Sequence, residues 1–384
     1  MKKTKLFLAV SLAVAAQAAL AYDTLHIGDV EVTPYARIVA GLDYTKDIVA
    51  SGVQGDRFQI ASNQWGTSFW GVTAAIPLTD GWKGIANLES GFGTNTGQTN
   101  NNGTLFNRDS NVGVTHEKFG TLTIGNHMWI SNDSLDLDPM GQQWMGLDSL
   151  AGGRNWGIGP NTLLYRTPVV AGLQASYMHM AGGAVDATNR GSGNGLSLSY
   201  ISGPLTLRVI GDEMADAFGR YTGGANYGLG SQGEWRFTKE IIAGGSYQLG
   251  AAKLFAGYNR ITAPDADYGL AVTYDTKAVQ TWLGVNYKLS EKLTWLGAVY
   301  HLDESVSGKK TNLFTTGLNY DWNKYFTLYA TVGSVHNNTI SDSAVEMDGA
   351  NNHALYYWNT ACGGSGDCNG ASSFGAYAGF ALKF

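Results

Sequence analysis

The sequence predicts an all-β chain that closes into one transmembrane antiparallel barrel of sixteen strands. Three observations lead to this prediction: an export signal at the N-terminus, many short segments of alternating polarity, and connections that alternate between short and long. Of the 384 residues, 52 are glycine, 12% are aromatic and only 15% are charged. This composition suits strands and loops better than helices.

Residues 1–21 are expected to be a signal peptide. Three lysines among the first five residues precede an apolar run over 6–14, and a small-residue triplet follows at 19–21. This is the three-part layout of a secretory signal, and the apolar run is too short for a spanning helix. We expect the mature protein to be one barrel domain of residues 22–384.

The mature chain is acidic. The signal holds three lysines and no acid, so 25 − 3 = 22 basic residues remain against 31 acidic ones, a net charge of −9. A nucleic-acid partner is not expected, because such a partner requires a basic surface. The mean hydropathy of −0.13 is too polar for a bundle of helices in lipid.

Sixteen segments alternate apolar with polar or small residues, and a period of two places successive side chains on opposite faces of a strand. In the last segment, Phe374, Phe380, Leu382 and Phe384 share one face, while the other face is small or polar. The predicted strands are 32–44, 66–76, 83–92, 105–116, 119–126, 161–168, 172–180, 193–200, 204–214, 241–249, 253–261, 279–289, 292–302, 311–320, 325–335 and 371–384.

The connections between these segments are of two kinds. Short turns are expected at 78–82, 250–252, 290–292 and 321–324, and long polar, glycine-rich loops at 93–103, 262–277 and 337–372. Short periplasmic turns and long external loops are typical of outer-membrane barrels, in which closure pairs every backbone group. A soluble sandwich would also alternate, but it has no reason to sort its loops by length.

Aromatic residues gather near the predicted short turns, as a girdle at a membrane interface would. They are Tyr287, Trp295, Tyr320, Trp322, Tyr325 and Phe326. Phe384 is placed by its strand at the same interface. The only cysteines, Cys362 and Cys368, lie in the last long loop of an exported chain, so a disulfide between them is expected. Free thiols or a metal pair are the alternative.

Several stretches resemble the trimeric general porins of Gram-negative bacteria, in particular their β-proteobacterial and neisserial branch. The stretches are 32–44, 87–97, 105–114, 119–126, 161–168 and the terminal Phe384. The resemblance implies a passive, water-filled channel for ions and small hydrophilic solutes in the outer membrane. It also implies a homotrimer in outer-membrane lipid, assembled by machinery that reads the C-terminal strand. No enzyme activity, cofactor or metal is implied.

In that family the third external loop folds into the lumen, and its carboxylates face arginines on the wall. The corresponding loop here is 128–160, and Phe69 stands where the family usually has an arginine. The residues that the resemblance makes candidates for the constriction are Arg37, Arg108, Arg154, Arg166, Asp133, Asp136, Asp138, Asp148 and Phe69. Because this match is incomplete and the chain is acidic, we expect a weakly cation-preferring or poorly selective pore.

Other interpretations remain open at this point. The loop aspartates also suit solvated positions or turn caps, and two acidic stretches have the oxygen-rich composition of calcium sites without a complete pattern. Inward-facing Phe69 and Trp282 would suit a channel that selects sugars, and wall arginines one that selects small anions. A barrel enzyme or a surface adhesin that acts through loop 337–372 is the third class of function.

Overall fold

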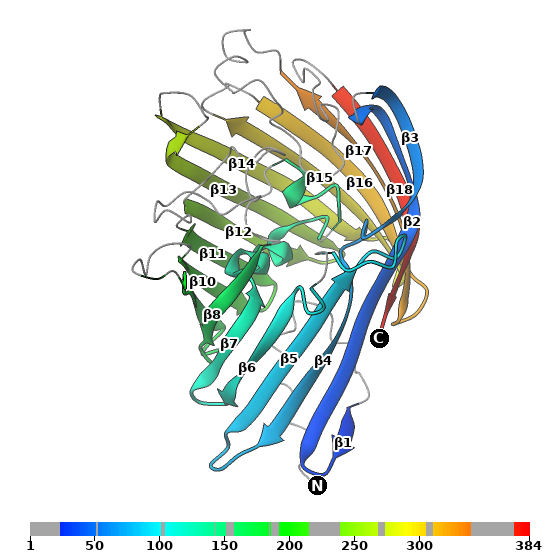
Figure 1. Ribbon diagram of the computed structural model, residues 1–384. Helices are drawn as coiled ribbons and strands as arrows, with labels where there is room; N and C mark the ends of the chain where they lie inside the picture. The colour runs from blue at the N-terminus through cyan, green and yellow to red at the C-terminus, as the bar shows by residue number, and fades with distance from the viewer. Residues whose placement is uncertain are drawn as a thin grey trace.

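The computed structural model consists mainly of one antiparallel sheet that curves round and closes on itself (Figure 1). It describes residues 24–50, 53–100, 104–141, 143–150, 157–183, 185, 192–214, 239–267, 273–304, 310–338 and 372–384. The predicted signal peptide, Arg154, Cys362 and Cys368 lie outside these ranges. Within them, no helix is both long enough and apolar enough to cross a membrane.

Eighteen strands are assigned within the described residues. They are β1 (Leu25–Ile27), β2 (Val30–Ala50), β3 (Val53–Ser62), β4 (Ser68–Pro77), β5 (Lys83–Phe92), β6 (Asp109–His116), β7 (Gly120–Met128), β8 (Ile158–Arg166), β9 (Leu173–Met180), β10 (Gly193–Ser202), β11 (Leu205–Met214), β12 (Lys239–Leu249), β13 (Ala252–Asp267), β14 (Thr273–Lys288), β15 (Leu293–Glu304), β16 (Lys310–Asp321), β17 (Phe326–Asn337) and β18 (Ser372–Lys383). Two short 3₁₀ helices, η2 (Ile130–Leu137) and η3 (Leu147–Ser149), lie between β7 and β8.

The wall of the barrel has sixteen strands, as predicted. β3 and β4 pair with successive parts of one edge of β2, residues 40–50 and 31–37, so together they make one interrupted barrel strand. β1 adds only three residues to β2, next to the end of β18. Each remaining strand pairs with its neighbours in chain order, and β18 pairs with β2 to close the ring.

Two predicted boundaries are wrong. Residues 53–62 form β3, although the second strand was expected only over 66–76, because the chain breaks the alternation of polarity between the two halves. The predicted loop 262–277 is mostly strand, since β13 runs to Asp267 and β14 begins at Thr273. That extension is polar, so the alternation that marks the other strands does not extend into it.

The two faces of the wall differ in the way that a barrel in lipid requires. In β10, Leu196 and Leu198 are about half exposed on the outer face, whereas Ser197 and Ser199, which alternate with them, are buried on the inner face. Around the ring the outer face carries large exposed apolar residues. The inner face carries small and polar residues together with large buried apolar ones, such as Ile210, Ile242 and Leu302.

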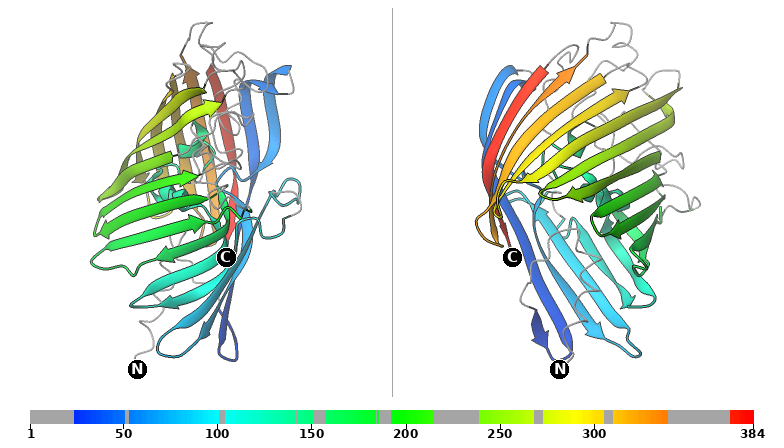
Figure 2. Two further views of the ribbon diagram at one scale, coloured as in Figure 1. Left: turned by 60° about the vertical axis from the view of Figure 1, so that its left-hand side comes forward. Right: turned by 180° about the vertical axis from the view of Figure 1, so that it is seen from behind.

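The last residue of the chain takes part in the closure of the barrel. The backbone amide of Ala36 donates to the carbonyl of Phe384 at 2.7 Å, and the amide of Phe384 donates to the carbonyl of Ala36 at 3.1 Å. Figure 2 shows the C-terminus beside β2 from two sides. The seam between β18 and β2 therefore extends to the final residue, which is 47% exposed.

Deletion of Phe384 is expected to destabilise the barrel through these two backbone bonds. Each backbone hydrogen bond contributes about 0.5–1.5 kcal/mol net, so the free energy of unfolding should fall by about 1–3 kcal/mol. The measurement is the temperature at which refolded protein loses its compact form on a gel, after refolding in detergent without assembly machinery.

Phe384→Ala is the matched control, since it keeps the backbone pair and removes only the exposed ring. It should unfold close to the wild-type temperature. Equal loss of stability in both variants would contradict a role for the terminal backbone pair.

Candidate functional site

Residues 129–141 and 143–150, which we call the inner segment, lie inside the barrel against its wall. The Trp129 indole donates to Asp212 on β11 at 2.9 Å, and the Trp282 indole on β14 donates to the carbonyl of Leu137 at 2.9 Å. Gln280, also on β14, donates to the carbonyl of Leu147 at 2.7 Å. These wall side chains all point inward, so the inner segment occupies part of the lumen.

Two wall arginines hold the acidic end of the inner segment. Arg166 on β8 contacts Asp133 at 2.9 Å, and Arg208 on β11 contacts Asp133 at 3.3 Å and Asp136 at 2.7 Å. Burial raises the pKa of a carboxyl, but the two guanidinium groups outweigh it and hold the pKa of Asp133 below its usual value. Arg208 is not among the residues selected from the sequence, although its place between outward-facing Leu207 and Val209 indicates the inner face.

Asp138 anchors the middle of the inner segment and does not face solutes. Its carboxyl group accepts hydrogen bonds from the amides of Met140 and Leu147, both at 3.1 Å, and from the hydroxyl of Tyr300 on β15. Only 4% of the residue is exposed. The carboxyl group therefore caps local backbone turns, and burial raises its pKa to about 7.

A stack of two arginines and one ring lies on the wall formed by β2, β4 and the start of β6. The guanidinium carbon of Arg37 lies 4.8 Å from the centre of the Phe69 ring, and that of Arg108 lies 5.1 Å from it. Arg108 also donates to the carboxylate of Glu89 on β5. Glu89 is not among the residues selected from the sequence either, yet the inward register of β5 places it beside Arg108.

The remaining candidates divide between buried and undescribed positions. Trp282 is 2% exposed beneath the inner segment, so it does not line an open path for sugars. The side chain of Asp148 is not among the described ones. Among the described residues, no group of three or more His, Cys, Asp or Glu could hold a metal ion.

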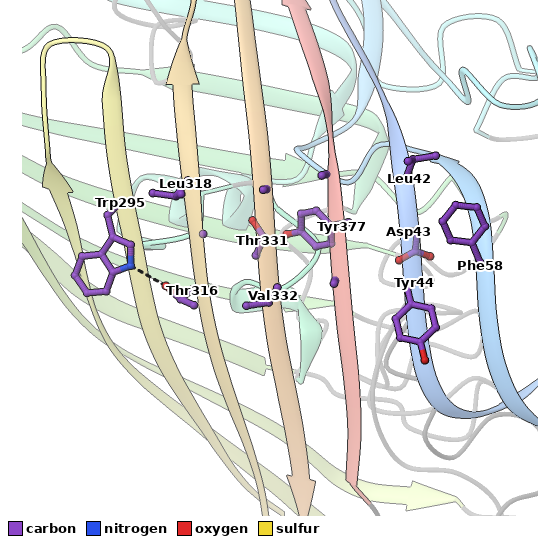
Figure 3. A pocket seen from close by; sticks show the side chains of 14 residues that line it. Leu42, Asp43, Tyr44, Phe58, Trp295, Thr316, Leu318, Thr331, Val332 and Tyr377 are labelled. Atoms are coloured by element: carbon purple, nitrogen blue, oxygen red, sulfur yellow. Dashed lines mark hydrogen bonds between the residues drawn. The ribbon is translucent and has the colours of Figure 1, made fainter.

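The outer wall carries a shallow apolar hollow that is separate from the lumen. Figure 3 shows its lining side chains, which come from β2, β3 and β15–β18 and include Leu42, Phe58, Trp295, Leu318 and Val332. Small residues also line it, among them Gly317, Ala330, Ala376 and Ala378. This hollow therefore belongs to the surface that meets lipid or another protein.

Comparisons with known proteins agree with this architecture. A family model described as Gram-negative porin matches residues 8–340. An outer membrane porin protein of Bordetella pertussis is 27% identical over 348 residues, which cover 79% of this chain and 88% of that protein.

Two solved structures share the fold. The anion-selective porin from Comamonas acidovorans has a TM-score of 0.72 at 20% identity and covers 92% of this chain and 100% of its own. The trimer form of OmpT from Vibrio cholerae has a TM-score of 0.59 at 14% identity and covers 93% of this chain and 100% of its own.

Arg208→Gln is expected to loosen the inner segment. Removing one member of a buried ion pair costs about 3–5 kcal/mol, and because these carboxylates are partly exposed the lower end applies. The expected result is a lower unfolding temperature and a noisier open-channel current in planar bilayers. Arg260→Gln, which removes an exposed guanidinium from the outer face of β13, is the matched control. Equal current noise in the two variants would contradict the anchoring role.

The contribution of Asp138 should depend on pH with a defined sign. A pKa of about 7 in the folded protein lies above the ordinary carboxyl value, so burial favours the neutral form. Its contribution to stability is therefore present at acid pH and lost as the pH rises through about 7. The unfolding temperature should fall between about pH 4 and pH 7 in the wild type, and this step should shrink in Asp138→Asn. An identical pH profile in both proteins would refute the assignment.

Proposed function

The chain belongs to the family of Gram-negative porins and forms an outer-membrane channel, and on this basis we propose that ions and small hydrophilic solutes pass through it with little preference for charge sign. A porin is a channel rather than an enzyme. Transport through such a channel is passive diffusion down a gradient, so the relevant properties are the width of the lumen and the charges that line it.

Local ion pairing supports weak selectivity. Fixed charges select ions most strongly when one sign dominates the narrow part of a pore or when opposite signs face each other across it. Here Asp133 and Asp136 contact Arg166 and Arg208 directly, and Arg108 contacts Glu89. Within each pair the two opposite charges largely cancel, so the electrostatic field of the pair falls off within a short distance. This pairing is the observation on which the proposal rests, and it agrees with the expectation of a poorly selective pore.

The Arg37–Phe69–Arg108 stack favours a second candidate, a channel that selects anions. The inward-facing Lys383 on β18 lies directly opposite Arg37 in the register, so three cations gather on this part of the wall. One structural neighbour is described as anion-selective. The two candidates differ in the reversal potential across a salt gradient, which is small for the first and large with the sign of chloride selectivity for the second.

We also propose the partners that the resemblance implies: outer-membrane lipid, assembly machinery that reads the C-terminal strand, and two further copies of this chain in a homotrimer. The small residues of the outer hollow, including Ala376 and Ala378, support the trimer, because small side chains let two protein surfaces approach closely in lipid. A neighbour of the same fold is described in a trimer form.

Glu89→Gln tests the pairing argument, because it removes the carboxylate beside Arg108 and leaves the guanidinium uncompensated. The reversal potential across a roughly tenfold gradient of potassium chloride should be close to zero in the wild type and should move toward chloride selectivity in the variant. Glu291→Gln makes the same change of charge in an exposed turn and is the control. An equal shift in both variants, or none in Glu89→Gln, would contradict the proposal.

A further inference from the structure

The second barrel strand leaves the wall for five residues. β3 ends at Ser62 and β4 begins at Ser68, and residues 63–67, which we call the inward bend, lie between them. Asn63 and Gly66 have φ angles of 65° and 93°, in the left-handed region that reverses the direction of a chain. The Asn63 side chain accepts a hydrogen bond from the Ser68 amide at 2.7 Å. This bond holds together the two points at which the chain leaves the wall and rejoins it.

Side chains replace the strand pairing of β2 beside the inward bend. Val39 on β2 lies opposite the interruption, and its amide donates to the hydroxyl of Ser68 at 2.9 Å. Its carbonyl accepts from the hydroxyl of Thr94 at 2.6 Å. Because side chains form hydrogen bonds with the backbone amide and carbonyl of Val39 in place of a neighbouring strand, we regard the interruption as an integral feature of the barrel and not as a defect.

Trp65 at the centre of the inward bend reaches side chains on the inner faces of β16, β17 and β18. Its indole donates to Asn319 at 3.1 Å, and its ring stacks on Tyr329 with a centroid separation of 6.4 Å and an interplanar angle of 19°. The ammonium of Lys383 lies 4.0 Å from the centre of the same indole. The ring is only partly buried, so part of it faces the lumen.

The inward bend also meets the inner segment. The carbonyl of Gln64 accepts from the amide of Trp144 at 3.0 Å, and the side chain of Gln64 accepts from the hydroxyl of Tyr329 at 2.9 Å. Next to this contact, Gln143 accepts hydrogen bonds from Thr331 and from Tyr377 at 2.7 and 3.1 Å. Two segments that are about eighty residues apart in the sequence are thus fixed to the same part of the wall.

We propose that the inward bend is a second constriction element, which narrows the channel together with residues 143–145 of the inner segment. In this arrangement the size limit for solutes is set by two neighbouring indole side chains on one part of the wall, Trp65 on the bend and Trp144 on the inner segment. The inference goes beyond passive conduction but rests on it, because a size limit has meaning only for a channel that conducts. It does not depend on the sign of the selectivity.

Trp65→Ala is the first test, measured by single-channel conductance and by the swelling rates of liposomes in neutral sugars of increasing size. Because the conductance of a wet pore follows its narrowest cross-section, it should rise at least about 1.3-fold, and larger sugars should gain most. Trp65→Phe, which keeps a ring against Tyr329, should fall between the wild type and Trp65→Ala. Trp70→Ala is the matched control, since it removes an exposed indole from the outer face of β4.

A second variant keeps the test decisive if Trp65→Ala folds poorly. In Trp65→Cys, a charged water-soluble thiosulfonate reagent should reach the new thiol through the lumen and lower the conductance in steps. The wild type, which has Cys362 and Cys368 of its own, is treated identically as the control.

The outcomes distinguish a failure of the proposed function from a failure of the constriction role of the inward bend. A folded wild type that never conducts would refute the proposed function itself. A conducting wild type whose conductance and sugar limit are unchanged in Trp65→Ala, or whose Trp65→Cys variant gives no conductance step with the reagent, would overturn only the constriction role of the inward bend.

Discussion

The need to pair backbone amides and carbonyls within a wall that lies in lipid is the constraint from which the rest of this structure follows. In lipid no water is available to satisfy such groups, so an antiparallel sheet has to close on itself. Here the closure is made by β18 against β2, and it continues through the backbone pair of Phe384 and Ala36. The same requirement explains why the backbone amide and carbonyl of Val39, opposite the inward bend, form hydrogen bonds with the side chains of Ser68 and Thr94.

A closed wall of this size encloses more space than its own inward side chains fill, and the chain uses two inserted segments to fill part of it. The inner segment is held by ion pairs to Arg166 and Arg208 and by the hydrogen bonds of Asp138. Such buried charges are costly to leave unpaired, so they position the segment more than they stabilise the barrel. Their mutual neutralisation also leaves a lumen whose nearest charges largely cancel, which links the anchoring of the segment to the proposed weak selectivity of the pore.

The wall was predictable from the sequence, and the lumen only in part. Period-two alternation placed all sixteen barrel strands because one face of each strand meets lipid and the other does not. The same alternation marks Arg208 and Glu89 as inward, but it gives no information on which charges meet. Those pairs depend on how the inner segment crosses the lumen. The inward bend escaped prediction because a five-residue interruption resembles a turn, and its contacts with Tyr329 and Lys383 join residues more than 250 positions apart.

Closure between the first and last long strands is tested most directly by a disulfide across the seam. Leu42 on β2 and Ala378 on β18 are register partners, and opposite residues of antiparallel strands lie about 4.5–5.5 Å apart at Cα, within the range of a disulfide. In folded Leu42→Cys/Ala378→Cys protein, mild oxidation should give an intramolecular disulfide between the two introduced thiols, identified by mass spectrometry of the digest. Absence of this bond, with both introduced thiols reactive to alkylating reagents in the folded protein, would contradict a closed barrel.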